Sequence, residues 1–434
     1  GVTPLVDAVL LWLEPNAPTL GWNAGDEHTF VAQLSRHAHF TTASNWIMNL
    51  PVMSCPVAGT DVAWEQLQVN RRLQVDPLLL DWPEDTHFTS FVLSDGDNVQ
   101  WFIGNFINHP NGYWQAEHRS AFPFGWTMPV DHLSQMCPPL LSYLARTASP
   151  NDQAITFPSG YYYPDAYGSA LTGDTDWYAE RVHMFAERTG RLGVRVLINI
   201  AEDWDGDGAM HGYQCFAQQV PDIAGVLAMQ YHPYNAGLGA VAWVKDSHRV
   251  PVPVVTPRFS IWSGLSRLEG NGSPALVAQL INERPHEGLP NSLDYFDWTI
   301  VHAWSRFKQA DTSENIFAEE LGKDKEKPTE GEHVRNAYEP TWWCVQRLAP
   351  HVRVVSPEEL LWRIRIHSKP GKTLDSLAKH LMSSPDIPPH QRKSLERYRE
   401  QLDATPPKTP QDVRVTFLRL QDIHLGKVLN HEKQ

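Results

Sequence analysis

The chain has 434 residues and a formal net charge of −14, from 36 Lys and Arg against 50 Asp and Glu. This acidic balance argues against sequence-independent binding to nucleic acid phosphates or to anionic membranes. No run approaches the roughly 18 apolar residues of a membrane span. The first residues show no secretion signal, but a secreted or periplasmic chain with its signal removed would look the same, so the compartment stays open, as does the oligomeric state. Tryptophan is the most frequent aromatic residue, with 17 Trp, 16 Phe and 13 Tyr, an order that a routine hydrophobic core does not require.

Short β-branched runs, each followed by a polar stretch and a segment of helical periodicity, predict repeated βα units. We expect strands at Leu5–Leu13, His39–Ala43, Thr89–Leu93, Gly125–Met128, Ala154–Phe157, Val194–Ile200, Ile223–Met229, Val252–Val255 and Trp298–Val301. Helices are expected at Glu27–His37, Val130–Ala148 and Trp177–Thr189. The repetition predicts an α/β protein with a (β/α) TIM-like, irregular barrel, and a doubly wound sheet is the alternative. In either fold, the polar residues after each strand gather at one end of the sheet.

The composition changes near residue 366 and predicts two domains. Residues 367–434 carry twelve Lys or Arg and eight Asp or Glu, a net charge of +4, which leaves −18 on residues 1–366. We therefore predict a barrel-like catalytic domain over 1–366 and a charged C-terminal extension over 367–434. The extension has two expected helices, Thr373–Met382 and Pro389–Leu402, and one alternating segment, Asp412–Leu420, with the pattern of a strand. The polar stretch Glu319–Asn336 reads as a surface loop.

The apolar run Thr89–Leu93 ends in the sequence Ser-Asp-Gly-Asp-Asn at residues 94–98, which places two carboxyls and an amide at the predicted barrel mouth. Asp95 and Asp97 are candidate catalytic residues, and Asn98 and Trp101 are candidate substrate contacts. Ordinary turn and helix-cap chemistry is an equal alternative for one of the two aspartates. Farther along, three consecutive tyrosines follow another predicted strand, and a phenol ring suits the faces and hydroxyl edges of a sugar. Tyr161 and Tyr163 are therefore expected to contact a carbohydrate.

The residues around these motifs resemble a known family. The stretch Phe124–Pro164, together with Ser94–Asn98, is similar to the GxGYxYP family of large bacterial proteins, which are described as glycoside hydrolases associated with carbohydrate processing. The likeness continues through Met229–Tyr234, Arg258–Trp262, Val301–Ser305 and Val352–Trp362. One departure is that the first glycine of the motif is either replaced by Pro158 or deleted with its neighbour, so the match begins at Gly160. The resemblance implies a barrel with a carbohydrate site more than it implies a particular reaction.

The run Ile198–Gly208 contains the densest group of acidic residues. Glu202 and Asp203 follow a predicted strand and are further catalytic candidates. Asp203, Asp205 and Asp207 match the first half of a calcium loop, although Gln214 stands where a bidentate glutamate is expected. A calcium or other divalent cation site and a solvated turn are the two alternatives for the three aspartates, and no cofactor is required.

Glycoside hydrolysis needs two carboxyl groups, one protonated as general acid and one ionised as nucleophile or base. We expect this pair among Asp95, Asp97, Glu202 and Asp203, without assigning the roles or the stereochemical course. Asp26 reads as a helix cap within the candidate ligand segment Trp22–Glu27. Further expected substrate contacts, which follow other predicted strands, are Trp46, Asn49, Gln230, His232, Arg258, Trp262, His302 and Trp304. Two alternatives stay open: a metal-dependent carbohydrate hydrolase or deacetylase using Asp95, Asp97 and His302, and a carbohydrate-binding protein without turnover.

Overall fold

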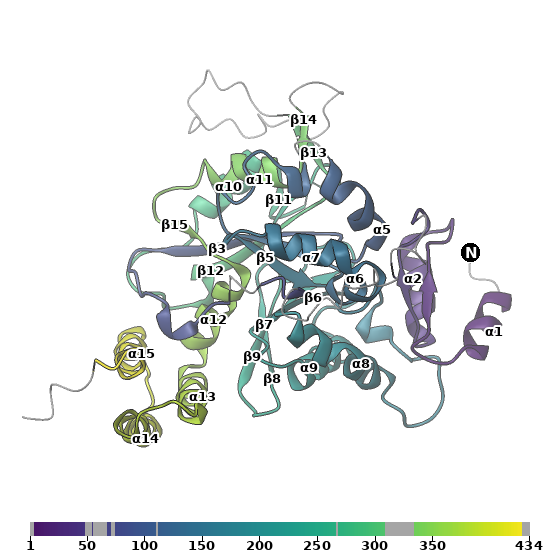
Figure 1. Ribbon diagram of the computed structural model, residues 1–434. Coiled ribbons are helices and arrows are strands. Elements are labelled where there is room, and N and C mark those ends of the chain that lie inside the picture. Colours follow the sequence, from purple (N-terminus) through teal and green to yellow (C-terminus); the bar gives the residue numbers. More distant parts are fainter. Residues whose placement is uncertain are drawn as a thin grey trace, which may run out of the picture.

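The computed structural model describes residues 4–47, 54, 67–70, 74–109, 112–265, 268–308 and 334–427. Its centre is a curled, mostly parallel sheet with the strand order β11-β10-β12-β3-β4-β5-β6-β7-β9-β8, in which β15 also pairs with β3 (Figure 1). The parallel strands are β3 (His87–Leu93), β4 (Phe124–Met128), β5 (Asp152–Thr156), β6 (Val196–Ala201), β7 (Gly225–Gln230), β9 (Pro251–Val255), β10 (Phe259–Ile261), β11 (Asn271–Gly272), β12 (Phe296–Val301) and β15 (Val352–Val354). Strand β8 (Val241–Lys245) runs antiparallel to β9.

Strands β3 to β7 lie side by side in chain order, and buried clusters cover both faces of the sheet. Every residue of β3, β4, β5, β6, β9 and β12 is buried, which explains why these strands are rich in apolar and β-branched residues. The buried carboxyl groups among them, Asp152 and Asp297, accept hydrogen bonds. Strand β9 pairs with β7, and β10 pairs with β12, while only residues 256–258 separate β9 from β10. The pairings in the described chain thus define a curled α/β sheet and do not close it into the predicted barrel.

Helices cover the outer face of the sheet, and one helix fills its inner face. The outer helices are α6 (Val130–Met136), α7 (Pro138–Thr147), α8 (Trp177–Arg191), α9 (Asp207–Gln219), α10 (Pro274–Asn282) and α11 (Tyr338–Val345). The predicted helix Val130–Ala148 is two helices because consecutive prolines follow Cys137, and a residue before proline avoids the helical conformation. Helix α12 (Pro357–Ser368) contacts β3, β7, β9 and β12, and Leu360, Leu361 and Ile364 complete the inner core.

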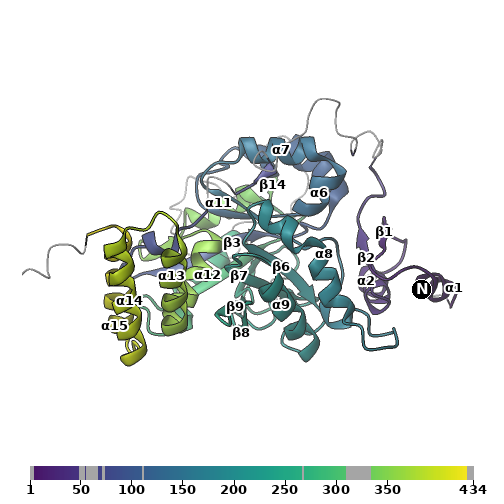
Figure 2. The same cartoon turned by 60° about the horizontal axis from the view of Figure 1, so that its bottom comes forward.

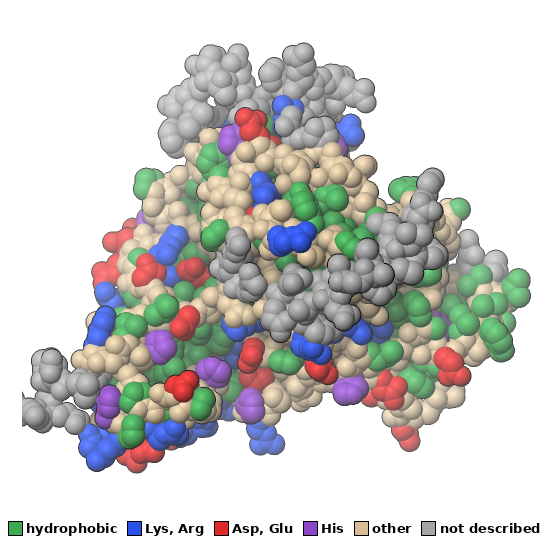
Figure 3. Space-filling model, in the orientation of Figure 1, with side chains coloured by type: hydrophobic (Ala, Val, Ile, Leu, Met, Phe, Trp, Pro, Cys, Tyr) green, Lys and Arg blue, Asp and Glu red, His purple; other side chains and the backbone are tan. Residues whose placement is uncertain are grey.

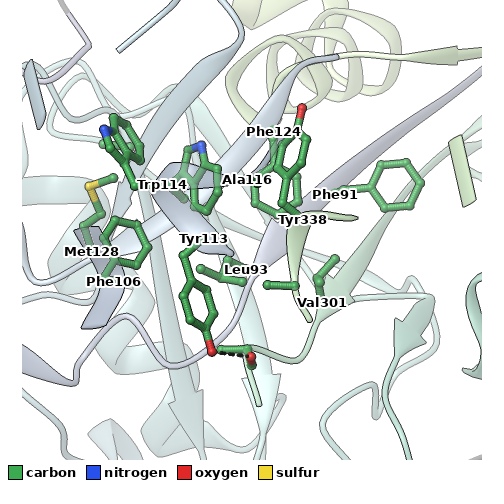
Figure 4. Close-up of a cluster of buried hydrophobic side chains, with 14 of the residues drawn as sticks. Phe91, Leu93, Phe106, Tyr113, Trp114, Ala116, Phe124, Met128, Val301 and Tyr338 are labelled. Carbon is green, nitrogen blue, oxygen red and sulfur yellow. Dashed lines mark hydrogen bonds between the residues drawn. The ribbon is translucent and has the colours of Figure 1, made fainter. Parts of the chain in front are cut away.

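The cluster between the sheet and the helices of the upper part in Figure 1 is rich in aromatic rings. Trp126 and Tyr338 stack at 5.6 Å between ring centroids, and Phe124 lies beside both. The hydroxyl of Tyr113 donates to the carbonyl of Ala303 at 3.0 Å (Figure 4). Part of the tryptophan content is therefore core packing, and the buried members are Trp101, Trp114, Trp126, Trp298 and Trp343.

Two expected strands are wrong. The run Leu5–Leu13 lies almost entirely in helix α1 (Pro4–Trp12), and the alternating segment Asp412–Leu420 lies in helix α15 (Pro410–His424). A short apolar run does not distinguish a strand from a helix by itself. In α15 the deciding signal is the capping box, in which Thr409 and Asp412 bond reciprocally and Pro410 takes the first helical position.

The two ends of the chain form the sides of the molecule (Figures 1 and 2). On one side, α1, β1 (Pro18–Leu20), α2 (Glu27–Arg36) and β2 (Phe40–Thr42) precede the sheet, and exposed apolar side chains of α1 gather at the right edge of Figure 3. On the other side, α13 (Pro370–Ser383), α14 (Pro389–Ala404) and α15 share a small apolar core with η1 (Pro77–Leu79). The two predicted C-terminal helices are confirmed, whereas the domain boundary at residue 366 stays a prediction. None of the helices described is both long and apolar enough to cross a membrane.

Shorter elements connect these parts. They are α5 (Val99–Trp101), the π-helical turn η2 (Phe102–Phe106), the 3-10 turns η3 (Tyr113–Gln115), η4 (Pro164–Ala166) and η5 (Leu293–Tyr295), and the hairpin of β13 (Arg306–Lys308) and β14 (Val334–Asn336). Most of the predicted loop Glu319–Asn336 lies outside the described residues, and its last three residues form β14.

Candidate active site

A cavity of about 680 Å³ opens at the carboxyl ends of the parallel strands. This is the edge at which polar residues after the strands were expected to gather, and ligands of curled and open α/β sheets bind there. Ile200, Met229 and Ile300, from the ends of β6, β7 and β12, form part of its lining. The other residues of the lining are Trp22, Glu27, Trp46, Ser94, Asp95, Asp97, Asn98, Gln100, Trp101, Gly104, Asn105, Tyr161, Tyr234, Trp262, His302 and Trp304.

The turn of residues 94–98 carries two carboxyl groups into this cavity. Gly96 presses against Thr127 at the end of β4, where a Cβ would lie 2.4 Å from the carbonyl carbon. Asn98 caps the following helix by accepting a hydrogen bond from the backbone of Trp101 at 3.1 Å. Asp95 adopts a left-handed backbone with φ of 62°. The turn is therefore held by packing on one side and by a helix cap on the other, with Asp95 and Asp97 between them.

Asp95 accepts two hydrogen bonds that orient its carboxylate. The hydroxyl of Ser94 donates to Oδ2, and the indole of Trp304 donates to Oδ1 at 2.8 Å. The Ser94 hydroxyl in turn accepts from the backbone N–H of Ala303 at 3.0 Å. Ala303 and Trp304, which follow β12, thus orient the carboxylate of Asp95, which follows β3.

Asp97 is the buried member of a cluster of three carboxyl groups. Burial raises the pKa of Asp97 to about 8, and the negative charges of Asp95 and Glu27 add to the shift. Desolvation is also the largest cause that raises the pKa of Glu27, although its side chain stays accessible. At neutral pH, Asp97 therefore holds a proton beside an acidic neighbour, which is the division of roles that an acid–base pair needs.

Glu27 reaches the cavity from the first turn of α2. Asp26 caps this helix by accepting from the backbone of Thr29 at 2.8 Å, so the expected cap is confirmed. The hydroxyl of Tyr161 donates to the Glu27 carboxyl at 2.9 Å. The segment Trp22–Glu27 was expected to touch a ligand, but nothing in its pattern separates this glutamate from the acidic residues that commonly occupy a first helical turn.

The three consecutive tyrosines serve mainly to attach the N-terminal segment to the sheet. Thr41 and Tyr161 exchange two backbone hydrogen bonds, and a Cβ on Gly160 would lie 2.4 Å from the ring of Phe40. Tyr161 keeps an atom in the cavity lining, as predicted, but Tyr163 is 0% exposed and packs in the inner core. The sugar contact expected of Tyr163 is therefore wrong, because a fully buried ring cannot contact a ligand in the cavity.

Aromatic rings form the walls of the cavity. Trp46 is 81% exposed and Trp304 is 42% exposed, so both present ring faces to solvent. Three other rings of the lining, those of Tyr234, Trp262 and His302, stack on one another. The ring centroids of Tyr234 and Trp262 lie 4.4 Å apart, and those of Trp262 and His302 lie 3.7 Å apart. Burial lowers the pKa of His302 against the opposing effect of Asp95, so the imidazole is neutral at pH 7.

The structure leaves two predicted catalytic residues outside the cavity. The carboxylate of Asp165 accepts hydrogen bonds from the backbone N–H groups of Glu202 and Asp203, at 3.2 and 2.9 Å, and so holds the backbone where β6 ends. The Glu202 carboxylate instead contacts the imidazole of His28 at 2.9 Å. Neither residue belongs to the lining, so the predicted pairing across one pocket with Asp95 or Asp97 does not form.

Three predicted substrate contacts also lie outside the lining, and a fourth is not described. Gln230 accepts from the backbone of Trp204 at 3.4 Å, Arg258 forms an ion pair with Asp294 at 3.1 Å, and His232 is exposed. Asn49 falls outside the described residues. The cavity does bring together the predicted set Asp95, Asp97, Trp46, Asn98, Trp101, Tyr161, Trp262, His302 and Trp304.

Neither predicted metal set converges in the described chain. Asp203, Asp205 and Asp207 do not bring three ligand atoms within 4.8 Å of one another, and neither do Asp95, Asp97 and His302. Asp207 is the first residue of helix α9, where an acidic side chain is favourable. The calcium site therefore stays a sequence-based prediction.

The fold and the site define a class: an α/β protein whose acidic, aromatic cavity lies at the carboxyl ends of a curled parallel sheet. Comparison with family models is specific. Residues 85–316 match the "GxGYxYP putative glycoside hydrolase C-terminal domain", and residues 1–55 match the "GxGYxYP third domain". The chain belongs to the GxGYxYP family, as its sequence indicated.

The fold is similar to the crystal structure of a putative hydrolase from Bacteroides thetaiotaomicron VPI-5482. The TM-score is 0.62 at 18% sequence identity, and the match covers 83% of this chain and 59% of that one. This likeness extends to the fold alone, and the chain spans less than two thirds of the length of that structure. The comparison with curated proteins gave no match.

Proposed function

We propose that the protein hydrolyses glycosidic bonds at the cavity formed by Glu27, Asp95 and Asp97. The observation that carries the proposal is a protonated, buried Asp97 beside the hydrogen-bonded carboxylate of Asp95 in an aromatic cavity. Membership of a family described as glycoside hydrolases and a hydrolase-like fold support the same reaction class. The aromatic faces suit the apolar faces of sugar rings, and the carboxyl and amide groups suit hydroxyl groups.

In this mechanism Asp97 is the general acid. It donates its proton to the glycosidic oxygen as the bond from that oxygen to the anomeric carbon breaks. Asp95 is the second carboxyl group, and it either attacks the anomeric carbon or takes a proton from the attacking water. Glu27 acts through charge, because its carboxylate helps to keep the proton on Asp97 at neutral pH.

The cavity also favours an uncharged sugar. Its described lining contains three carboxyl groups and the neutral His302, and it includes no lysine or arginine. A uronic acid or a sulfated sugar would place a second anion in a poorly solvated acidic site, which is unfavourable. We therefore propose a neutral glycan as the substrate.

The test separates the acid from the second carboxyl group by leaving-group chemistry. Wild type, Asp97→Asn, Asp95→Asn and the exposed control Asp205→Asn are assayed on neutral oligosaccharides and on aryl glycosides with an acidic phenol leaving group. We expect Asp97→Asn to lose about 10²–10⁴-fold in kcat/KM on oligosaccharides. It should lose much less on the aryl glycosides, which leave without protonation.

Asp95→Asn should lose activity on both kinds of substrate, and Asp205→Asn should behave as wild type. Equal losses on both substrates for Asp97→Asn would remove it from the role of general acid. If wild type cleaved none of a broad panel of neutral glycosides while binding them, the enzyme proposal itself would fail.

A further inference from the structure

A separate cluster of metal-ligand atoms lies between helices α8 and α9, outside the lining of the cavity. It consists of Asp176, which precedes α8, and of His211 and Cys215, which lie one turn apart on α9. Their ligand atoms all lie within 4.8 Å of one another. The two helices pack side by side in both ribbon views. This cluster takes no part in the proposed hydrolysis.

Each ligand atom is held toward the same point. The Asp176 carboxylate uses Oδ1 to cap α8 through the backbone of Ala179 at 2.9 Å, which leaves Oδ2 directed at His211. The spacing of four residues puts His211 and Cys215 on one face of α9, the arrangement that lets two side chains of a helix share one ion. The thiol is buried, whereas His211 and Asp176 are about half exposed, so an ion could enter from solvent.

The distances fit a tetrahedral site. With ligand bonds of about 2.0 Å to nitrogen or oxygen and about 2.3 Å to sulfur, tetrahedral geometry requires N···O near 3.3 Å and N···S near 3.5 Å. The structure has His211 Nε2 at 2.9 Å from Asp176 Oδ2 and at 3.6 Å from Cys215 Sγ. A shift of a few tenths of an ångström would therefore convert the hydrogen-bonded cluster into a ligand set.

We propose that Asp176, His211 and Cys215 bind a zinc-class divalent cation, with water as the fourth ligand. Thiolate, imidazole and carboxylate together favour zinc or cobalt over calcium and magnesium, which prefer all-oxygen sites. On binding, the Cys215 thiol releases its proton to solvent as the metal–sulfur bond forms. The Nε2 proton that His211 donates to Asp176 leaves as well, and solvent returns one to Nδ1 to give the other neutral tautomer, so two metal bonds replace the hydrogen bond between His211 and Asp176. The ion would then join the start of α8 to the middle of α9.

The experiment uses the full chain after chelator treatment, titrated with Co²⁺ and, separately, with Zn²⁺. We expect one Co²⁺ per chain with a thiolate-to-cobalt charge-transfer band, displaced by Zn²⁺. Zn²⁺ should also raise the melting temperature of wild type. Cys215→Ser should lose the band and the shift in melting temperature, and His211→Gln should weaken binding at least tenfold.

Two controls keep the test interpretable. Cys137→Ser alters another buried cysteine outside the cluster and should retain the band. Asp176→Asn keeps a good cap for α8, so it should fold normally while it binds more weakly. Absence of the charge-transfer band in wild type, or its persistence in Cys215→Ser, would overturn the proposal. Glycosidase assays are not part of the readout, so failure here leaves the proposed hydrolysis intact.

Discussion

The burial of Asp97 affects the reaction and the stability of the fold in opposite directions. Burial raises the pKa of this carboxyl to about 8 in the folded protein, whereas the ordinary pKa of an aspartate is 3.8. Between these two values the unfolded chain binds fewer protons than the folded one, so stability falls as the pH rises. The burial that keeps a proton on Asp97, the proposed general acid, therefore lowers the free energy of unfolding.

Replacement of Asp97 by asparagine should raise the free energy of unfolding at pH 7 and make its decrease between pH 5 and 8 smaller. Part of the decrease should remain, because burial also raises the pKa of Glu358, to about 7. The decrease due to Asp97 in wild type is at most about 1.4 kcal/mol per pH unit. Chemical denaturation of wild type, Asp97→Asn and Asp205→Asn at several pH values measures both effects. Identical pH dependence in wild type and Asp97→Asn would contradict the burial argument.

At the scale of elements, the turn between β3 and α5 depends on the absence of a side chain at residue 96. Thr127 both crowds this position and donates its hydroxyl to the carbonyl of Leu93 at 2.8 Å. Strands β3 and β4 share one pair in register, Val92 with Gly125, so the turn adds contacts where the ladder is short. The geometry of the two aspartates is therefore coupled to the packing of β4.

Gly96→Ala should destabilise the protein by about 1–3 kcal/mol, because a Cβ would overlap Thr127 and move the turn. Activity on neutral glycosides should fall as well, since Asp95 and Asp97 flank the position. Gly371→Ala is the matched control: no atom lies within 4 Å of its added Cβ, and it should be neutral or stabilise by up to about 1 kcal/mol. Thermal unfolding of both variants would show the difference, and equal melting temperatures would refute the crowding.

Strands and the edge of the site could be predicted from sequence because both depend on local pattern. Thr89–Leu93 is apolar and its successor residues are polar, so the placement of Asp95 and Asp97 at the carboxyl edge followed from parallel pairing alone. The role of Glu27 could not be predicted, because it depends on the hydrogen bond from Tyr161, a residue 134 positions away. The position of Glu202 outside the lining likewise involves tertiary contacts with His28 and Asp165, which no periodicity encodes.

The whole molecule combines a net charge of −14 with a cavity whose described lining has three carboxyl groups. Both the carboxyl groups of the cavity and the net charge of the whole chain therefore disfavour anionic ligands. Salt screens the effect of the distant charges. The C-terminal extension has a net charge of +4 and lies across the sheet from the N-terminal segment in Figures 1 and 2. The extension does little to offset the field at the cavity.

A neutral oligosaccharide should bind at least tenfold more tightly than its counterpart with a uronic acid at the same position. Isothermal titration at low and at physiological ionic strength measures both affinities. The difference should shrink as salt increases and should also shrink in Glu27→Gln, which removes one of the cavity charges. Tighter binding of the acidic sugar would exclude the neutral-glycan assignment.

The cavity is composite, since Trp22, Glu27 and Trp46 belong to the N-terminal segment while Asp95, Asp97 and Trp304 belong to the curled sheet. The two parts correspond to the two separately matched family regions. A sugar held between them would act as a reversible crosslink, adding RT ln(1 + [L]/Kd) to their cohesion, about 2.7 kcal/mol at a hundredfold excess over Kd. A higher concentration of substrate would then strengthen the attachment of the N-terminal segment to the curled sheet. Release of product would weaken that attachment in each turnover.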